Sequence, residues 1–422
     1  MSPVEPEARE PLDLTNPILA EFWTEEPSVV DAKLAEIRHQ PPAFYPEPYT
    51  ASIGIGPGAW AITQYDLILE MSRTPEVYSS AKGITVFDLP PDFNDFFSSI
   101  IAMDDPRHAH LRRLVSKGFT PRMMQRLEGS IVTQANEIID EVSDRGSCDF
   151  VLDLAARLPL AIVCDLMGVP RSHLDFIFEQ TNIILGASDP EYVPRGDDIV
   201  SSLLQAGGAL AELMTDVASS KKGGDGDDLT SILVNAEIDG EQLSTADIAS
   251  FFILLVVAGN ETTRNAISWG LHYLTHNPDQ RRIWQDDLER VTPTAVEEIV
   301  RLASPVTLMR RTATRDTMLG GVDIAEGDKL AMFYLAANRD DEMFVDPLQF
   351  KVTRSPNRHI GFGGPGPHFC LGAHLARREI GVMFTELFRR LPDIEATAMP
   401  DVLQSNFIHG IKHLPVKFTP GG

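Results

Sequence analysis

The sequence is poor in cysteine and in positive charge. Its 422 residues include only three cysteines, Cys148, Cys164 and Cys370, too few for a disulfide framework, which favours a reducing compartment. Asp and Glu outnumber Lys and Arg by 61 to 36, and the net charge is −25. This balance argues against nucleic-acid binding, which needs clustered basic side chains, and against adhesion to an anionic membrane surface.

Long apolar runs are also missing. The longest, from Phe251 to Ala258, has eight residues, whereas a membrane-spanning helix needs about 20. The first residues, MSPVEPEAREPLDL, are acidic and proline-rich and do not resemble a secretory signal. We therefore expect a cytoplasmic protein without a membrane anchor, whose residues 1–20 form a poorly ordered arm.

Helical periodicity dominates what is present. Apolar residues recur at helical spacing from Gln125 to Val142, and a longer pattern runs from Ser244 to about Leu274. Ser244 and Asp247 form a capping-box pattern at its start. A helix of about 30 residues is roughly 45 Å long, enough to cross the centre of the molecule.

A further helix is expected to start at Pro293, a residue favoured at the first helical position, and to end before Pro305. Between Arg311 and Val352 the helical periodicity gives way to short β-like runs. No repeat or low-complexity tract divides the chain. We therefore predict a mainly α protein with a smaller β portion, in which residues 1–422 form a single domain.

The segment HIGFGGPGPHFCLG, residues 359–372, crowds glycine and proline before Cys370, which opens a predicted helix. A phosphate-binding loop fits poorly, because no Gly-Lys-Ser/Thr follows and proline removes backbone donors. Zinc ligation by His368, Cys370 and His374 is a second alternative, but no CxxC or HExxH completes the set. Axial ligation of haem iron explains more: the helix N-terminus favours a thiolate, and glycines let the backbone approach a flat macrocycle.

The same segment resembles the cysteine loop of the cytochrome P450 monooxygenases. The matching residues are Phe362, Gly363, His368, Cys370 and Gly372. Phe362 lies eight residues before the cysteine instead of the usual seven, a spacing found in some actinobacterial lipid and steroid oxidisers. The resemblance implies the P450 fold, with haem b between the long central helix and the cysteine-loop helix.

The stretch AGNETT in the long helix is similar to the family's oxygen-binding motif. Glycine inside a helix costs about 1 kcal/mol, and threonine can divert the hydrogen bond of a carbonyl one turn earlier. Ala258 and Gly259 are therefore expected to line a groove. The resemblance implies catalytic roles for Glu261 and Thr262 in delivering protons, with Glu261 leading to solvent.

Two further sets of residues match the family in the correct order along the chain. Glu298, Arg301 and Arg354 match its buried structural ion pairs. The residues that match its contacts to the haem propionates are His108, Arg112, Arg311 (in preference to the adjacent Arg310) and His359.

The resemblance implies that one atom of O2 is inserted into a hydrophobic substrate. Electrons would come from NAD(P)H through a ferredoxin reductase and a ferredoxin, and the enzyme would be a monomer. A local basic patch is expected to dock the ferredoxin; its residues are Arg112, Arg113, Lys117, Arg377 and Arg378.

The predicted substrate pocket is apolar, which suits a lipid or terpenoid chain. Several stretches look similar to mycobacterial enzymes that hydroxylate the terminal carbon of methyl-branched lipids, so we predict ω-hydroxylation of branched fatty acids or isoprenoids. Oxidation of a sterol side chain or another terpenoid is the alternative. A peroxide-driven peroxygenase and a non-catalytic haem-binding protein are less compatible with the acid–threonine pair. The expected pocket residues are Phe87, Phe93, Phe97, Leu254, Val257, Val306, Leu308, Phe407 and Ile408.

Overall fold

The computed structural model describes residues 15–47, 58–88, 100–118, 121–194, 198–235, 237–238, 241–242 and 244–421. The fold is mainly helical with a smaller β portion, as the sequence predicted. The α-helices are α1 (Pro27–Arg38), α2 (Tyr65–Arg73), α4 (Arg107–Gly118), α5 (Pro121–Ser143), α6 (Arg157–Met167), α7 (Leu174–Leu185), α8 (Ile199–Lys221), α9 (Leu229–Asn235), α10 (Thr245–His276), α11 (Pro278–Asp286), α12 (Leu288–Ala303), α13 (Tyr334–Ala337) and α14 (Ala373–Arg390).

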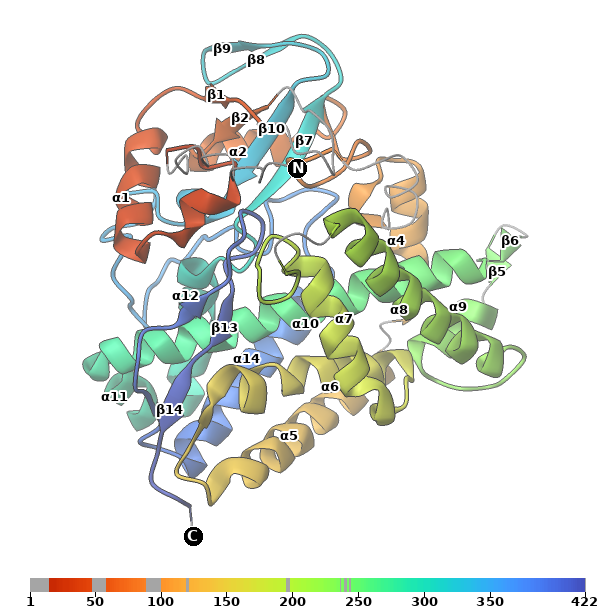
Figure 1. The fold of residues 1–422 in the computed structure, drawn as a ribbon, viewed down its shortest axis with the longest axis vertical. Helices are drawn as coiled ribbons and strands as arrows, with labels where there is room; N and C mark the ends of the chain where they lie inside the picture. Colours follow the sequence, from red (N-terminus) through yellow and green to blue (C-terminus); the bar gives the residue numbers. More distant parts are fainter. Residues whose placement is uncertain are drawn as a thin grey trace, which may run out of the picture.

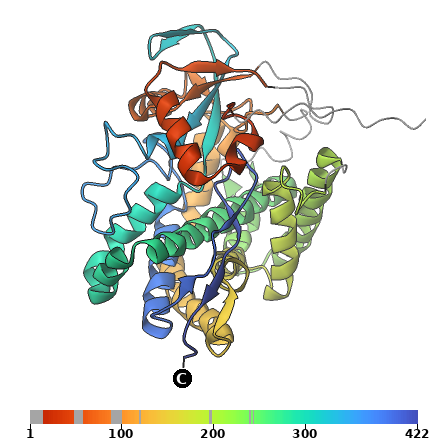
Figure 2. The same ribbon diagram turned by 60° about the vertical axis from the view of Figure 1, so that its left-hand side comes forward.

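The strands are short and form one larger sheet with several small ones. The five-stranded sheet has the order β1-β2-β10-β7-β3, with β10 parallel to β2 and antiparallel to β7. It lies at one end of the molecule, away from most of the helices (Figures 1 and 2). The strands are β1 (Ala43–Tyr45), β2 (Ala59–Ile62), β3 (Tyr78–Ser79), β4 (Ser147–Asp149), β5 (Glu237–Ile238), β6 (Glu241–Gln242), β7 (Leu308–Ala313), β8 (Thr317–Leu319), β9 (Val322–Ile324), β10 (Lys329–Phe333), β11 (Glu395–Ala396), β12 (Asp401–Val402), β13 (Ile411–His413) and β14 (Pro415–Lys417).

Helix α10 crosses the middle of the molecule (Figure 1), as its length and apolar pattern predicted. The predicted capping box is present: the Asp247 N–H donates to Ser244 Oγ at 3.1 Å, and the Ser244 N–H donates to Asp247 Oδ2 at 3.1 Å. The helix then packs against α6, α8, α12 and α14. None of the helices in the described part of the chain is long and apolar enough to cross a membrane.

The predicted start of α12 was wrong. The helix begins at Leu288, because the Asp287 side chain accepts the Arg290 N–H at 3.2 Å and caps the first turn. Pro293 therefore lies inside the helix and not at its first position. The predicted end is correct, since the helix stops at Ala303 and Ser304 takes a left-handed backbone conformation.

The N-terminal segment is packed from its first described residues. Ile18 and Phe22 are fully buried in a cluster with Leu34 and Phe333. The expected arm of residues 1–20 is therefore ordered in its last part, because these apolar side chains cover the sheet. Residues 1–14 lie outside the described residues.

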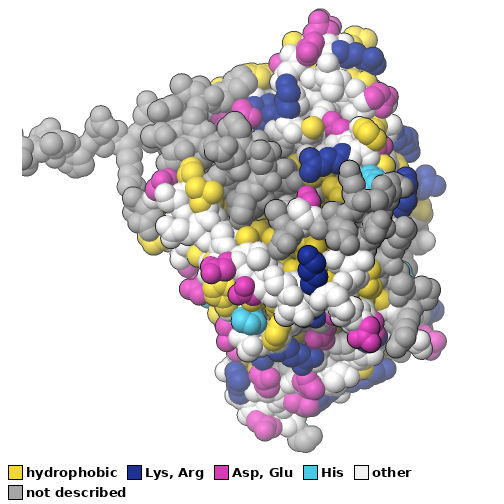
Figure 3. All heavy atoms as spheres, turned by 90° about the vertical axis from the view of Figure 1, so that its right-hand side faces the viewer, with side chains coloured by type: hydrophobic (Ala, Val, Ile, Leu, Met, Phe, Trp, Pro, Cys, Tyr) yellow, Lys and Arg dark blue, Asp and Glu magenta, His cyan; other side chains and the backbone are white. Residues whose placement is uncertain are grey.

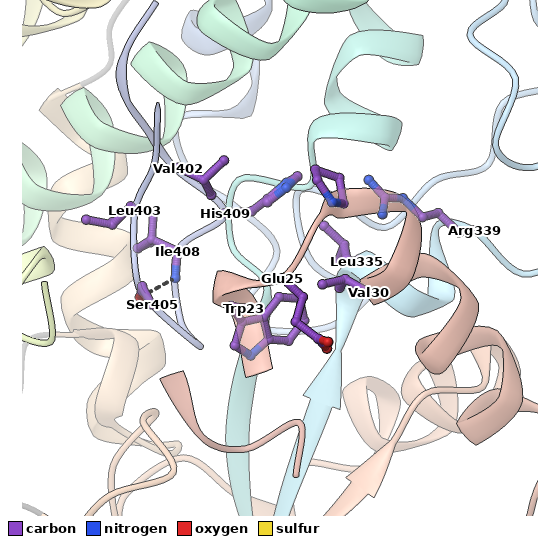
Figure 4. Close-up of a pocket in the computed structure, with 11 residues that line it drawn as sticks. Trp23, Glu25, Val30, Leu335, Arg339, Val402, Leu403, Ser405, Ile408 and His409 are labelled. Carbon is purple, nitrogen blue, oxygen red and sulfur yellow. Dashed lines mark hydrogen bonds between the residues drawn. The ribbon is translucent and has the colours of Figure 1, made fainter. Parts of the chain in front are cut away.

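A small pocket beside α1 is lined by Trp23, Val30, Leu335 and Ile408, with His409 and Arg339 at its side (Figure 4). The His409 ring stacks on Trp269 with 4.3 Å between ring centroids, and its Nδ1 lies 2.5 Å from the Ala303 carbonyl oxygen. Burial, together with the charge of Arg339, lowers the pKa of His409 to about 3. The native protein therefore holds this histidine neutral.

This histidine should make the protein sensitive to acid. Between the unfolded-state pKa of 6.5 and the folded-state pKa of about 3, only the unfolded chain binds the proton, so stability should fall as the pH falls. We expect His409→Phe to reduce the slope of unfolding free energy against pH by up to about 1 kcal/mol per pH unit. Urea unfolding at several pH values in this window measures the slope, and equal slopes in both proteins would contradict the prediction.

Candidate functional site

The cysteine loop places Cys370 directly before α14. The Cys370 N–H donates to the Phe362 carbonyl at 3.0 Å, and Gly363 turns the chain with a φ of 86°, a conformation that favours glycine. Gly366 lies against the end of α2, since a Cβ there would be 2.1 Å from the Ser72 carbonyl oxygen. The glycines of this segment thus shape a turn that other residues could not adopt.

Protein atoms surround the Cys370 thiol although the residue is exposed. Its side chain is exposed, yet burial raises the pKa of the thiol, opposed by the N–H groups of Gly372 and Ala373 and by Arg112. The sulfur is therefore accessible even though much of its surroundings is protein. Gly372 adds room there, because a Cβ at that position would contact nothing within 4 Å.

Helix α10 carries the second group of candidate site residues. Leu254, Ala258 and Thr262, spaced four residues apart on one face, are only half-buried although the helix lies at the centre of the molecule. Helix α10 meets α14 at Gly270, where a Cβ would lie 2.8 Å from the Phe384 ring. Thr262 lies about 12 Å before this contact along α10, and Ala373 about 16 Å before it along α14. Both residues therefore lie N-terminal to the contact between the two helices.

Four nitrogen-bearing side chains gather beside the loop: His108 and Arg112 of α4, Arg311 of β7, and His368. The rings of His108 and His368 are 4.3 Å apart between centroids, and Arg112 donates to the Phe369 carbonyl at 2.6 Å. Burial, followed by the charges of Arg311, His108 and Arg112, lowers the pKa of His368 to about 3. His368 is therefore neutral, and Arg112 and Arg311 supply positive charge beside it.

Arg311 is the clearest sign that an anion belongs there. It is 5% exposed, and burial lowers its pKa, opposed in part by the charge of Asp104. Within the described residues, its hydrogen bond goes to the Arg310 carbonyl at 2.8 Å, and no carboxylate forms an ion pair with it. A buried cation without a counter-charge is costly. Arg310, by contrast, pairs with Asp88 at 2.5 Å, so the geometry favours Arg311 as the anion contact.

His359 does not join this cluster, and its expected role as a propionate contact was wrong. Its Nε2 lies 2.9 Å from Glu297 Oε2, and its Nδ1 accepts the Gly361 N–H at 3.1 Å. Both ring nitrogens are thus occupied. The turn at Gly363 brings His368 to the anion-binding side of the loop instead.

The predicted structural network is formed as the spacing indicated. Arg301 donates to both Glu298 oxygens at 2.8 and 2.9 Å, and Arg354 Nε lies 3.0 Å from each. Glu298 and Arg301 are fully buried. Asn357 and the Lys351 N–H also donate to Glu298, so one carboxylate fixes the chain that leads into the cysteine loop.

The acid–threonine pair lies at the half-buried stretch of α10. Thr262 Oγ1 donates to the Ala258 carbonyl at 2.7 Å, the diverted bond that the sequence suggested. Glu261 is 1% exposed and forms an ion pair with Arg264, so it does not face solvent directly in this structure. Arg264 also donates to Asn182 of α7 at 2.9 Å, which links the acid to a neighbouring helix.

The predicted substrate-pocket residues divide into three groups. Leu308 of β7 is buried in the core cluster that contains Trp23 and Leu335, and Ile408 is buried at the pocket of Figure 4, so these two predictions were wrong. Phe93 and Phe97 lie outside the described residues. The remaining five are half-buried: Phe87, Leu254, Val257, Val306 and Phe407.

The residues present fit a haem group. An accessible thiol at a helix N-terminus can supply the iron ligand, and the cluster of His108, Arg112, Arg311 and His368 can neutralise two carboxylates. The threonine-bearing face of α10 is half-buried, so its side chains are open to a bound group. This combination of donors is that of a haem-thiolate protein.

Comparison with known proteins agrees with this class. The Cytochrome P450 family model matches residues 207–407. The chain is 46% identical to the methyl-branched lipid omega-hydroxylase of Mycobacterium tuberculosis over 94% of this chain and 93% of that protein. It is 36% identical to the steroid C26-monooxygenase of Mycolicibacterium smegmatis over 92% and 91% of the two chains.

A solved structure is similar over almost the whole length. A Mycobacterium marinum cytochrome P450 in complex with pseudoionone superposes with a TM-score of 0.91 and 39% identity, covering 97% of this chain and 100% of that one. The chain therefore belongs to the cytochrome P450 family and is a monooxygenase. Members of this family use haem and O2 with electrons from redox partners.

Sequence reasoning missed three residues of the site. Arg264 and Asn182 hold Glu261, and Glu297 binds His359. Arg264 lies three positions after Glu261, the same spacing that identified Glu298 and Arg301, so this pair could have been found. Asn182 and Glu297 contact residues distant in sequence, for which one sequence carries no signal.

Proposed function

We propose that this enzyme binds haem b through Cys370 and hydroxylates the terminal carbon of methyl-branched lipids. The observation that carries the haem proposal is the accessible thiol beside buried, unpaired Arg311. When bound, the haem would supply oxygen activation, for which a thiolate ligand donates electron density. His108, Arg112, Arg311 and His368 would hold its propionates.

The chain's own residues would control protons and exclude water. Thr262 would offer its hydroxyl at the groove where it now bonds the Ala258 carbonyl. Glu261 would carry protons to it, and its ion pair with Arg264 means that the carboxylate must leave the guanidinium to do so. Asn182 of α7 would keep Arg264 in place, so that the Glu261 carboxylate could pair with it again.

The substrate proposal rests on the relatives and on the apolar lining. The relative named for methyl-branched lipids is 46% identical, against 36% for a relative named for steroids. Leu254, Val257 and Phe407 are apolar and half-buried, and they would contact a hydrocarbon chain. Side-chain oxidation of a steroid is the second candidate. We further propose NAD(P)H as the electron source, a cytoplasmic location and a monomer that forms one domain.

Product analysis tests this function. The purified enzyme, supplied with ferredoxin, reductase and NAD(P)H, should bind a methyl-branched fatty acid more tightly than its straight-chain analogue, by about fourfold for each buried methyl group. The product should be the terminal alcohol, identified by mass spectrometry. Products oxidised only in mid-chain would contradict ω-hydroxylation, and a preference for a sterol would favour the second candidate.

We propose that the electron donor is a ferredoxin that docks on a small basic area near the cysteine loop. Arg113 and Arg378 are exposed there, whereas Arg112 bonds the Phe369 carbonyl and Arg377 pairs with Glu297. The side chain of Lys117 lies outside the described residues. On the face shown in Figure 3, basic and acidic side chains are interspersed, so such an area would be local.

Charge reversal at Arg113 tests the docking area. We expect Arg113→Glu together with Lys117→Glu to raise the KM for ferredoxin about tenfold at low salt, with a smaller effect at high salt because salt screens exposed charges. Arg282→Glu, on exposed α11, is the matched control. Steady-state turnover against ferredoxin concentration measures the effect, and an unchanged KM would rule out this surface.

A further inference from the structure

Glu297, the residue before Glu298 on α12, binds residues from both sides of Cys370. Arg377 Nε lies 2.5 Å from Glu297 Oε1, and Arg377 Nη2 lies 2.9 Å from Oε2. His359 Nε2 lies 2.9 Å from the same Oε2. One carboxylate therefore joins the segment before the cysteine loop to the first turn of α14 after it.

The two partners of Glu297 continue to Phe362. The Arg377 guanidinium carbon lies 4.3 Å from the centroid of the Phe362 ring, a cation–π distance, and the His359 ring lies 5.9 Å from it. The Phe362 carbonyl in turn accepts the Cys370 N–H at 3.0 Å. Glu297 is thus connected to the backbone of the cysteine through three successive contacts, with two residues between them.

The two adjacent carboxylates of α12 hold different parts of the loop. Glu298 binds Arg354, Asn357 and the Lys351 N–H, which precede the loop. Glu297 binds His359 and Arg377, which flank the loop itself. Glu298 and its partner Arg301 are fully buried, whereas the Glu297 side chain is 26% exposed.

The charge state of Glu297 suits this role. Burial opposes ionisation, but the hydrogen bonds from His359 and Arg377 outweigh it and lower the pKa of Glu297 to about 2. The carboxylate is therefore ionised at neutral pH. A charged, bidentate partner orients a guanidinium more strictly than a neutral one does.

We propose that Glu297 is a positioning residue for the thiolate ligand: through Arg377 and His359 it fixes Phe362, and through Phe362 it fixes the orientation of Cys370. This inference rests on the proposed ligation by Cys370. The expected consequence of losing Glu297 is a loop that folds but holds its thiolate less firmly.

The test uses Glu297→Gln, Arg377→Lys and the double variant, each as purified holoenzyme. After reduction and CO binding, the thiolate-type Soret band converts to the thiol-type band in mild denaturant, and the rate of this conversion is measured. We expect each single variant to accelerate conversion on the order of fivefold. The double variant should be no faster than the faster single one, because both changes remove the same contact.

Glu141→Gln is the matched control, because Glu141 also pairs with an arginine, Arg157, through both oxygens, but on the exposed surface of α5. It should leave the conversion rate unchanged, and global unfolding followed by tryptophan fluorescence should be similar in all variants. Rates for Glu297→Gln and Arg377→Lys within twofold of the parent, or equal acceleration by Glu141→Gln, would overturn the inference. A parent protein without any thiolate-type band would overturn the Cys370 ligation itself and the inference with it.

Discussion

Replacing Cys370 with serine should remove the thiolate-type Soret band of the reduced CO complex and lower turnover by about 10³-fold or more, equivalent to at least about 4 kcal/mol in the activation barrier. A serine oxygen is a harder and weaker electron donor than a thiolate, so the push toward oxygen-bond cleavage is lost. The loop itself should still form, because its hydrogen bond uses the residue 370 N–H and not the side chain. Absorption spectra and product formation measure both effects.

Cys148→Ser is the control for this experiment, since Cys148 is also free and partly exposed but lies on β4. That variant should keep the parent spectrum and activity. A Cys370→Ser protein that retained the thiolate-type band would mean that a different group binds the iron. The buried Arg311 would then still require an anion, but the role of the cysteine loop would need another explanation.

The features that sequence predicted well depend on local spacing. The capping box at Ser244 and the Glu298–Arg301 pair join residues three positions apart, and helical geometry alone brings such residues together. The glycine content of the segment before Cys370 likewise predicted a tight turn. Only glycine tolerates the backbone conformation at Gly363 and the close approach at Gly366.

The histidines show where local reasoning ends. His359 and His368 flank the same turn, and which of them faces the arginines depends on how Gly363 rotates the chain. That rotation is fixed by contacts with distant elements, Val300 of α12 against Gly361 and Ser72 of α2 against Gly366. A single sequence gives no signal for either contact. It therefore could not show which of the two histidines lies beside the arginines.

The pocket residues failed for a related reason. An apolar residue in a strand can face either side of the sheet, and Leu308 of β7 faces the core cluster that contains Trp23 and Phe333. Ile408, which lies outside the strands, faces the small pocket beside Trp23. In α10, the helical period places Leu254, Ala258 and Thr262 on one face, and all three are half-buried.

The largest effect on stability should come from Glu298→Ala. This change leaves the Arg301 guanidinium, fully buried, and the Arg354 guanidinium, 8% exposed, without their carboxylate. Removing one partner of a buried ion pair costs about 3–5 kcal/mol, because the remaining charge is desolvated and uncompensated. Urea unfolding should show this loss, together with a lower haem content, since the same carboxylate holds Asn357 just before the cysteine loop.

Two further variants make this prediction testable even if Glu298→Ala does not fold. Glu298→Gln keeps the shape and can still accept hydrogen bonds from Arg301 and Arg354, so it should fold with a smaller loss of stability. Glu395→Ala breaks an exposed pair with Lys417 and should cost less than about 1 kcal/mol. If Glu298→Gln unfolded at the parent urea concentration, the charge of Glu298 would be unimportant. The arginines would then be held by the carbonyl groups of Pro347, Gln349 and Val345, which they also contact.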